Sequence, residues 1–321
     1  MSQPPFPPPP ESAHQQEALP ACWWHPNRRT GLRCVRCDRP ACPECLREAS
    51  VGHQCVDCVH AAREQQRAQQ VRYRRAGYGA RTPAGARASS SVVVTPVLIA
   101  LNVLVYVFTA VQAQDPMRNT SALYQDGALV PWFVAEYGEW WRLLTGGFLH
   151  YGLLHIVMNM FALLILGRDL ELLLGKVRFL ALYFVSLLGG SVAVQLFGFP
   201  LQPTVGASGA IYGLLGAILV AVLRLRLNPT AILMVIGLNL VITFSVPNIS
   251  WLGHLGGFVV GAVIMVAMLY APEGNRAALQ FGAVALIAVA LVGLVFLRDA
   301  QLADMVCGFR GNEAVCVPGA R

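Results

Sequence analysis

Long apolar runs separated by short polar stretches make up the chain after residue 91. The runs lie at 92–112, 147–166, 179–198, 207–223, 230–246, 250–270 and 278–297. Each run approaches the ~20 residues that a helix needs to cross the hydrocarbon core of a bilayer. The pattern predicts an all-α membrane protein with seven spanning helices, of which the fourth and fifth are the least clearly defined.

The first 91 residues are polar and basic and contain no long apolar run. Residues 1–20 are rich in Pro and Gln, which is typical of a disordered tail. Residues 21–60 hold seven of the nine cysteines and predict a small domain. Residues 61–91 predict a linker whose Arg/Gln-rich first part has a helical composition and whose Gly/Ala/Ser/Arg-rich second part is expected to be flexible. The remaining divisions are a membrane core at 92–270, a seventh helix at 278–297 and a tail at 298–321.

The distribution of basic residues predicts the orientation in the membrane. Of the 24 Lys and Arg residues, 13 lie in the first 88 positions, whereas the later loops divide six against five. An excess of Lys and Arg marks the cytoplasmic side, and the first 20 residues lack the apolar core of a cleavable signal peptide. We expect a plasma-membrane protein with a cytoplasmic amino terminus and an outer carboxyl tail. The net charge of +7 is then explained by topology and does not indicate nucleic acid binding, although the basic residues before 92 could contact anionic lipid.

This orientation also predicts the state of the last two cysteines. Cys307 and Cys316 would lie in an oxidising space outside the cell, where disulfides form and persist. A Cys307–Cys316 disulfide is our hypothesis for the tail. The other cysteines would stay in the reducing cytosol.

Two side chains suited to acyl transfer lie within the apolar runs. Ser208, in a Gly-Ala-Ser-Gly segment, opens the fourth run, and His254, flanked by glycines, lies near the start of the sixth. No Asp or Glu occurs within 179–270, so His254 has no carboxylate nearby in the sequence. Ionisable groups in lipid are costly and mark function, and a serine paired with a histidine suggests a nucleophile and its base. The structural alternatives are a small-residue packing motif at Ser208 and an interhelical hydrogen bond at His254.

The spacing of small residues predicts close contact between the helices that carry this pair. Glycines recur every four residues on the sixth helix, at Gly253, Gly257 and Gly261. Such a smooth face allows a close helix approach, which could bring His254 within the ~2.6–3.2 Å of a Ser–His hydrogen bond. Tyr212, one turn after Ser208, is placed to stack on the imidazole.

The second run supplies further polar groups. His155 and Asn159 are four residues apart and therefore share one face of a helix. Imidazole or amide groups aimed at a developing oxyanion are what acyl transfer needs. Interhelical hydrogen bonding is the alternative role, and it fits His150 better than His155.

In this order the motifs resemble those of the rhomboid intramembrane serine proteases. The matching segments are Trp141-Arg142, His150, His155-x-x-x-Asn159, Gly167-x-x-x-Glu171-x-x-x-Gly175, Gly206-x-Ser208-Gly209 and the Gly-flanked His254. The resemblance covers about 92–270. It implies a six-helix bundle, to which part of the family adds a seventh helix.

The resemblance also implies a mechanism and a substrate class. Ser208 would be the nucleophile and His254 its general base, without an acidic third member. His155, Asn159 and the Ser208 backbone N–H would stabilise the oxyanion, with His150 and Tyr212 in support. The substrates would be single-pass or polytopic membrane proteins, cut within a transmembrane helix near the outer face, and catalysis would need no cofactor.

Other classes of protein compete with this interpretation. A rhomboid-like relative can bind membrane clients without cutting them, and the small Cys-rich domain at 21–60, the head, could make this chain such an adaptor. The intact Ser208–His254 pair argues against that role. A secondary transporter lacks support because the membrane core has no carboxylate relay. The chain has no His-Glu-x-x-His motif of a metalloprotease and no pair of intramembrane aspartates.

The head contains four closely spaced pairs of metal-ligand residues. They are Cys22 and His25, Cys34 and Cys37, Cys42 and Cys45, and Cys55 and Cys58. Eight such ligands suffice for two tetrahedral zinc sites, and a cytosolic location favours metal over disulfides. The arrangement resembles a B-box-type finger, in which the first and third pairs share one ion and the second and fourth the other; sharing between consecutive pairs is the alternative. His53 could replace a ligand but is expected at the surface. We expect two structural zinc ions and a cytoplasmic protein partner of the finger.

Overall fold

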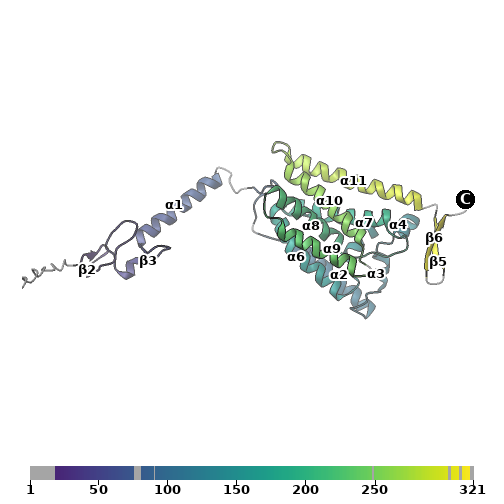
Figure 1. Cartoon of the computed structure of the whole chain (residues 1–321), viewed down its shortest axis with the longest axis horizontal. Helices are drawn as coiled ribbons and strands as arrows, with labels where there is room; N and C mark the ends of the chain where they lie inside the picture. The colour runs from purple at the N-terminus through teal and green to yellow at the C-terminus, as the bar shows by residue number, and fades with distance from the viewer. Residues whose placement is uncertain are drawn as a thin grey trace, which may run out of the picture. The chain divides into compact units, whose positions relative to one another are not determined.

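A computed structural model describes residues 19–75, 81–89, 91–247, 249–302, 305–310 and 313–318. The chain divides into two compact units, Met1–Tyr78 and Gly79–Arg321 (Figure 1). Most of the predicted 1–20 tail lies outside the described residues. The first unit is a small Cys-rich domain followed by a helix, and the second is a bundle of apolar helices.

The first unit holds short strands and one long helix. Strands β1 (Ala21–Cys22) and β2 (His25–Arg29) pair antiparallel, as do β3 (Leu46–Glu48) and β4 (His53–Cys55). A 3₁₀ turn, η1 (Pro43–Cys45), precedes β3, and helix α1 (Val56–Arg75) follows β4. The buried residues of this domain are mostly cysteines, with Ala41 and Leu46. Because a domain this small buries little apolar surface, it depends on another stabilising element.

Seven apolar helices form the second unit, as the hydropathy pattern predicts. They are α2 (Val94–Ala113), α6 (Leu153–Leu174), α7 (Lys176–Phe197), α8 (Ser208–Arg224), α9 (Thr230–Ser245), α10 (Trp251–Tyr270) and α11 (Arg276–Leu302). Among the described residues, five of these helices are long and apolar enough to cross a membrane, and α8 and α9 are shorter. The chain is a mostly helical membrane protein that is preceded, at its amino-terminal end, by a small Cys-rich domain.

The predicted start of the second spanning helix was wrong. The apolar run begins at 147, but α6 begins at Leu153. The residues between them form the 3₁₀ turn η2 (Gly146–Phe148) and an extended stretch in which Gly152 precedes the helix. Glycines and extended backbone stop helix propagation there, although the side chains are apolar.

Three short helices connect α2 to α6, and one arginine holds them together. They are α3 (Ala122–Gly127), α4 (Pro131–Tyr137) and α5 (Arg142–Thr145). The guanidinium of Arg142 is buried and donates to the carbonyl oxygens of Gln125 (2.7 Å) and Ala128 (2.8 Å). It also pairs with Glu139. The Trp-Arg motif therefore anchors the loop to its own backbone.

Glu171 has a structural role. The carboxylate is buried and accepts hydrogen bonds from the backbone N–H groups of Val93 (2.7 Å), Val94 (2.8 Å) and Thr95 (2.8 Å). These groups open helix α2, where backbone donors lack partners within the helix. A carboxylate from α6 thus caps α2 and joins the two helices.

Part of the predicted flexible linker is ordered. Residues 81–87 form a turn in which Arg81 pairs with Arg87 across an isolated bridge. Ala84 and Ala86 are buried, and Ala84 packs in the core of the second unit. A small-residue composition therefore reflects close packing here, because methyl groups fit where larger side chains would not.

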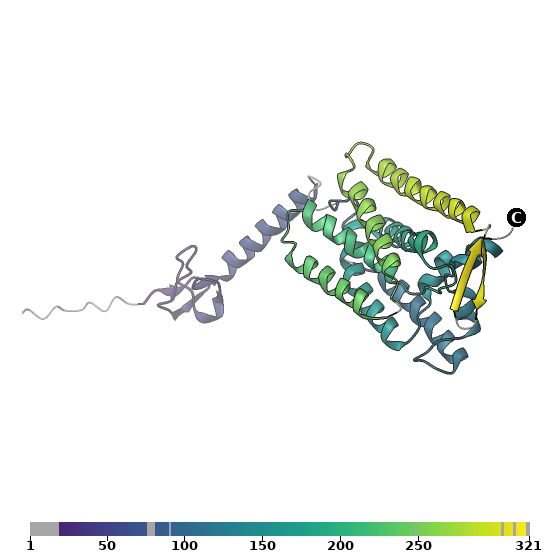
Figure 2. The same ribbon diagram turned by 45° about the vertical axis from the view of Figure 1, so that its right-hand side comes forward.

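The tail contains the disulfide that the orientation argument predicts. Strands β5 (Met305–Arg310) and β6 (Glu313–Pro318) form an antiparallel hairpin after α11 (Figure 2). Cys307 and Cys316 lie opposite each other and are joined, with Cα atoms 4.0 Å apart.

Helices α7, α8 and α10 pack closely at the centre of the bundle. A Cβ added to Gly257 of α10 would lie 1.9 Å from the Gly209 carbonyl oxygen of α8, and one added to Gly261 would lie 2.1 Å from that of Gly213. A Cβ on Gly190 of α7 would lie 2.6 Å from the Gly253 carbonyl oxygen. The predicted glycine face of α10 is therefore the surface on which the neighbouring helices lie.

Gly257→Ala is expected to force α10 away from α8, because the added methyl has no space. Overpacking of this kind costs about 1–3 kcal/mol, so the thermal unfolding midpoint in detergent should fall. Gly237→Ala in α9 is the control, since its methyl would meet no described atom within 4 Å. A Gly257→Ala protein as stable as the Gly237→Ala protein would contradict the close contact.

Candidate active site and metal centres

His254 lies in the first turn of α10 and is held on two sides. Its ring stacks on Tyr212, with ring centroids 3.9 Å apart and an interplanar angle of 12°. Its Nδ1 atom lies 2.9 Å from Thr243 Oγ1. Only 8% of the residue is exposed. The stacking that the sequence spacing predicts is therefore present, and the imidazole has one defined orientation.

Thr243, in the last turn of α9, was not identified from the sequence. Its hydroxyl is buried, donates to the Asn239 carbonyl oxygen (2.7 Å) and lies 2.6 Å from the Tyr212 hydroxyl. The Tyr212 hydroxyl also donates to the Asn239 carbonyl oxygen (2.9 Å). The network therefore connects α8, α9 and α10 around the imidazole. The sequence indicated this role only through the presence of a hydroxyl in an apolar run. That signal is weak, because threonine commonly donates a hydrogen bond to a carbonyl oxygen of its own helix.

Ser208 is the first residue of α8 and is half-buried. Gly206, two residues earlier, has a φ of +125°, a region that favours glycine. A Cβ at Gly206 would lie 2.7 Å from His155 Nε2 and 3.6 Å from Ser208 Oγ. The absence of a side chain at Gly206 thus leaves a space that both the His155 imidazole and the Ser208 hydroxyl border.

Backbone contact between α8 and α10 brings the Ser208 and His254 segments together. Gly209 follows Ser208, Gly253 precedes His254, and the Cβ position of Gly209 lies 3.5 Å from the Gly253 carbonyl oxygen. Within the described residues, no hydrogen bond joins Ser208 Oγ to His254, and Nδ1 is the ring nitrogen that carries the contact to Thr243. Nε2 is therefore the nitrogen left to act on a hydroxyl.

The remaining polar residues of the second spanning helix differ in their contacts. Asn159 Nδ2 donates to the His155 carbonyl oxygen (2.8 Å) within α6, and no described hydrogen bond links Asn159 to Ser208. His150 is fully buried beside His155, with ring centroids 5.0 Å apart. Neither His150 ring nitrogen has a hydrogen-bond partner in the described part of the chain. Among the described residues His150 therefore makes no interhelical hydrogen bond, which was its alternative role, and its contact with His155 is one of ring packing.

A small cavity lies beside Ser208, and a larger one adjoins it. One of about 30 Å³ is lined by Ser208, Gly206, Ser191, Ser250 and Gly253, among others. The other, of about 260 Å³, lies between the loop after α7 and the loop before α10 and shares Val194, Thr204 and Ser250 with the first. The smaller has room for about two waters, and its polar lining could hold them.

The metal-ligand pairs of the head gather into two groups of four. Cys22, His25, Cys42 and Cys45 form one, and Cys34, Cys37, Cys55 and Cys58 form the other. The first pair therefore joins the third, and the second joins the fourth, as in the predicted crossed arrangement. Sharing between consecutive pairs is not found. His53 belongs to neither group and is exposed, as expected.

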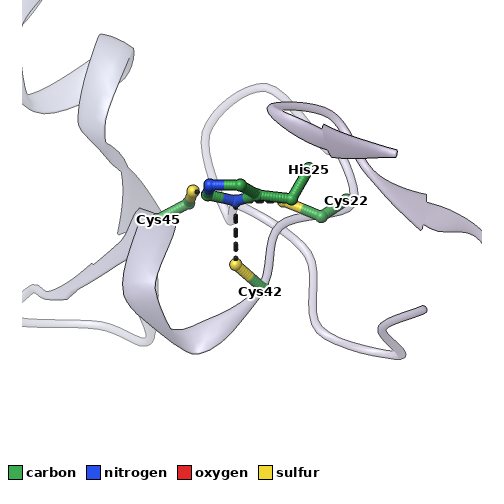
Figure 3. A group of neighbouring side chains, drawn as sticks. All are labelled: Cys22, His25, Cys42 and Cys45. Atoms are coloured by element: carbon green, nitrogen blue, oxygen red, sulfur yellow. Dashed lines mark hydrogen bonds between the residues drawn. The ribbon is translucent and has the colours of Figure 1, made fainter. Parts of the chain in front are cut away.

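The distances within each group fit a tetrahedral zinc site. In the first group, His25 Nδ1 points toward three sulfurs at 3.8, 3.5 and 3.4 Å, those of Cys22, Cys42 and Cys45 (Figure 3). Standard Zn–S and Zn–N bonds at tetrahedral angles place such atoms about 3.5 Å apart. The sulfurs of Cys37 and Cys55 in the second group are 3.7 Å apart, and tetrahedral geometry gives about 3.8 Å.

Electrostatics in the head also favour a cation. Burial and the neighbouring thiols raise the pKa of Cys45 and of Cys58 to about 12. At Cys22 and Cys34 burial raises the pKa, but hydrogen bonds from backbone N–H groups outweigh it, so the pKa falls to about 6. Each group therefore combines sulfurs that ionise readily with sulfurs that ionise only when a positive charge is near.

Comparison with known proteins places this chain in one family. A model described as the Rhomboid domain matches residues 137–271. Rhomboid protease GluP from Bacillus subtilis (strain 168) is 38% identical over 63% of this chain, which spans 40% of the length of that protein. RHOMBOID-like protein 6, mitochondrial, from Arabidopsis thaliana is 33% identical over 59% of this chain and 70% of its own length.

The bundle of apolar helices, in which α8 carries Ser208 and α10 carries His254, is that of a multi-pass membrane protein. Because the chain is 33% identical to a rhomboid-like protein over 70% of that protein, it belongs to the rhomboid family. The head adds two Cys/His groups that could hold metal ions.

Proposed function

We propose that the protein is an intramembrane serine endopeptidase in which Ser208 is the nucleophile and His254 the general base. The observation that carries this proposal is the orientation of His254, whose Nδ1 atom lies 2.9 Å from Thr243 while its ring stacks on Tyr212. A general base needs one ring nitrogen held by a hydrogen bond and the other free to take a proton. The 38% identity to Rhomboid protease GluP supports the same activity.

The hydrogen bonds suggest how the proton moves. Because Thr243 donates its hydroxyl hydrogen to the Asn239 carbonyl oxygen, its oxygen can accept a hydrogen bond from His254 Nδ1–H, and Nε2 is then the unprotonated base. Ser208 Oγ attacks the scissile carbonyl carbon as Nε2 takes its proton. The imidazolium then donates through both nitrogens, and Nε2 returns the proton to the leaving amine. Thr243 can accept from Nδ1–H at every stage.

The negative charge that develops on the carbonyl oxygen needs donors near Ser208. The backbone N–H of Ser208 opens α8 and has no partner within the helix. His155 Nε2 borders the same space beside Gly206. We assign both groups to the oxyanion site, with Asn159 joining them when substrate displaces its bond to the His155 carbonyl oxygen. Such donors each contribute roughly 10²–10³ in kcat.

Hydrolysis in a membrane needs both water and an unwound substrate. The cavity of about 30 Å³ at Ser208 could hold the water, and the adjoining cavity of about 260 Å³ could take an extended segment. A transmembrane helix must unwind before attack, because its carbonyl groups are hydrogen-bonded. We propose membrane-protein substrates that carry helix-breaking residues near the outer end of a span.

Labelling with a fluorophosphonate tests the nucleophile directly. The purified full-length protein in detergent should be labelled, and Ser208→Ala should not. Ser191→Ala is a matched control, since Ser191 lines the same cavity but donates to the Leu143 carbonyl oxygen (2.7 Å). Equal labelling of native and Ser208→Ala protein would exclude Ser208 as the nucleophile. If the native protein is labelled but cleaves none of the membrane-protein substrates tested, the client-binding adaptor is favoured.

Thr243→Val should slow cleavage because it removes the partner of His254 Nδ1. Loss of one buried hydrogen bond costs about 1–3 kcal/mol, so kcat should fall about tenfold or more, with KM little changed. Thr243→Ser keeps the hydroxyl and should restore most of the rate. If Thr243→Val lowers the unfolding midpoint while fluorophosphonate labelling keeps its native rate, Thr243 has no role in positioning the imidazole.

For the head we propose two structural zinc ions, one in each Cys/His group. Four protein ligands per ion leave no open position for water, so the ions would stabilise the fold rather than take part in hydrolysis. We also propose a cytoplasmic amino terminus in the plasma membrane, on the basis of the arginine-rich head, and a cytoplasmic protein as partner of the finger.

A further inference from the structure

A group of arginines lies at the end of the membrane unit opposite Ser208. Arg178 is in the first turn of α7 and Arg276 is the first residue of α11. The Ser208 cavity is lined by Val194, near the other end of α7. The step from Arg178 to Val194 corresponds to roughly 24 Å of helix rise. The arginines are thus separate from the proposed active site.

Gln280 joins the segments that carry these arginines. It is fully buried, and its Oε1 atom accepts a hydrogen bond from Arg178 Nε (2.7 Å). Its Nε2 atom donates to the carbonyl oxygens of Ala84 (3.0 Å) and Met268 (2.7 Å). One amide therefore connects α7, α10 and α11 with the turn at 81–87. These contacts also fix the Nε edge of the Arg178 guanidinium and leave its two terminal nitrogens available.

The positive charges of this group lack matching negative charges. The Arg276 side chain lies on the turn, because a Cβ at Gly85 would be 2.6 Å from its Cδ atom. Arg276 and Arg81 are the like charges that act on the Arg178 guanidinium. Across the described residues, no carboxylate lies within 4.0 Å of Arg178 or Arg81, and Arg276 has a weak contact with Glu273, 3.6 Å away and 93% exposed.

We propose that Arg81, Arg178 and Arg276 bind the phosphate of an anionic phospholipid headgroup. Guanidinium groups bind phosphate oxygens in a bidentate manner, and basic pockets between transmembrane helices bind anionic headgroups on the cytoplasmic side. The apolar rim fits the acyl chains of a lipid better than it fits a soluble anion. Val177 is 65% exposed and Leu279 49% exposed, while Phe281 lies 5.5 Å from the Arg178 guanidinium.

The site includes the turn at 81–87, which follows α1 in the sequence. A bound headgroup would relieve repulsion between arginines on the turn, α7 and α11 and hold the turn against the bundle. The proposal does not depend on proteolytic activity, and its test measures lipid binding alone.

Native mass spectrometry of the full-length protein provides the test. The protein is released from nanodiscs of phosphatidylcholine containing roughly one phosphatidylglycerol in five lipids. Native protein should retain phosphatidylglycerol in preference to phosphatidylcholine. The double variant Arg178→Gln with Arg276→Gln should lose that preference about tenfold or more, because each arginine near an anionic headgroup contributes about 1 kcal/mol. Arg81→Gln, which changes an exposed residue of the turn, should lose part of it without affecting folding.

Matched controls separate this site from general charge. Arg168→Gln with Arg224→Gln removes the same charge from α6 and from the last residue of α8, outside the group, and should keep the preference. Equal retention of phosphatidylglycerol by the two double variants would overturn the proposal. Inorganic phosphate added to protein in pure phosphatidylcholine nanodiscs should leave the unfolding midpoint unchanged. A rise in midpoint that Arg178→Gln with Arg276→Gln abolishes would identify a soluble anion as the occupant and would also overturn it.

Discussion

His254→Ala is expected to lower cleavage of a transmembrane substrate by roughly 10⁴-fold or more, as is Ser208→Ala. Neither group can perform its step alone, because the hydroxyl is a weak nucleophile until the imidazole takes its proton. The double variant should therefore be no slower than either single variant. Cleavage is measured as the initial rate of fragment release in proteoliposomes.

Controls distinguish loss of chemistry from loss of fold. His53→Ala removes an exposed histidine of the head that belongs to neither Cys/His group, so it should cleave at the native rate. The unfolding midpoint of Ser208→Ala should remain native, since Ser208 Oγ makes no described hydrogen bond that the variant would lose. Native cleavage by His254→Ala would defeat the proposed dyad, and additive losses in the double variant would show that the two residues act independently.

Removal of metal is expected to unfold the head while the membrane unit stays intact. Without zinc the sulfurs of each group repel one another or take up protons, and the small apolar core cannot hold the strands. A strong chelator should make residues within 21–60 sensitive to protease in the full-length protein. The bundle should keep its helical signal, because its core does not involve the cysteines of the head.

Zinc analysis of single variants tests the crossed pairing. Native protein should contain two equivalents of zinc, and Cys42→Ser and Cys55→Ser should each lose about one. Under crossed pairing Cys22→Ser with Cys42→Ser removes ligands from one site and keeps one equivalent, whereas consecutive pairing predicts that both sites are damaged. His53→Asn is the control and should keep both ions. A native protein with well under one equivalent, or one that resists protease after chelation, would contradict structural zinc.

The apolar helices could be predicted from the sequence because hydropathy is a local property summed along one segment. All seven apolar runs correspond to helices, and the motif spacing placed Tyr212 on the face that meets His254. The start of α6 at Leu153 was missed because apolar side chains continue through a glycine-rich loop. Composition likewise failed at 81–87, where small residues are packed rather than flexible.

The spacing of the Cys and His pairs in the head predicts metal sites. Which two pairs share one metal ion, however, depends on contacts between residues far apart in the sequence. Consecutive and crossed pairing use the same residues and the same spacing. The choice depends on which turns the paired strands bring together, and the structure groups His25 with Cys42 and Cys45.

The sequence by itself determined where the apolar helices lie, the chemical types available within them and the eight candidate metal ligands, since each depends on residues near one another in the chain. Tertiary structure alone decided that Thr243 of α9 contacts His254 of α10 and that Gln280 of α11 joins Arg178 of α7 to the turn at 81–87. These contacts depend on how helices are packed and rotated against one another. That packing is set by the summed shape of many side chains, and no local pattern encodes it.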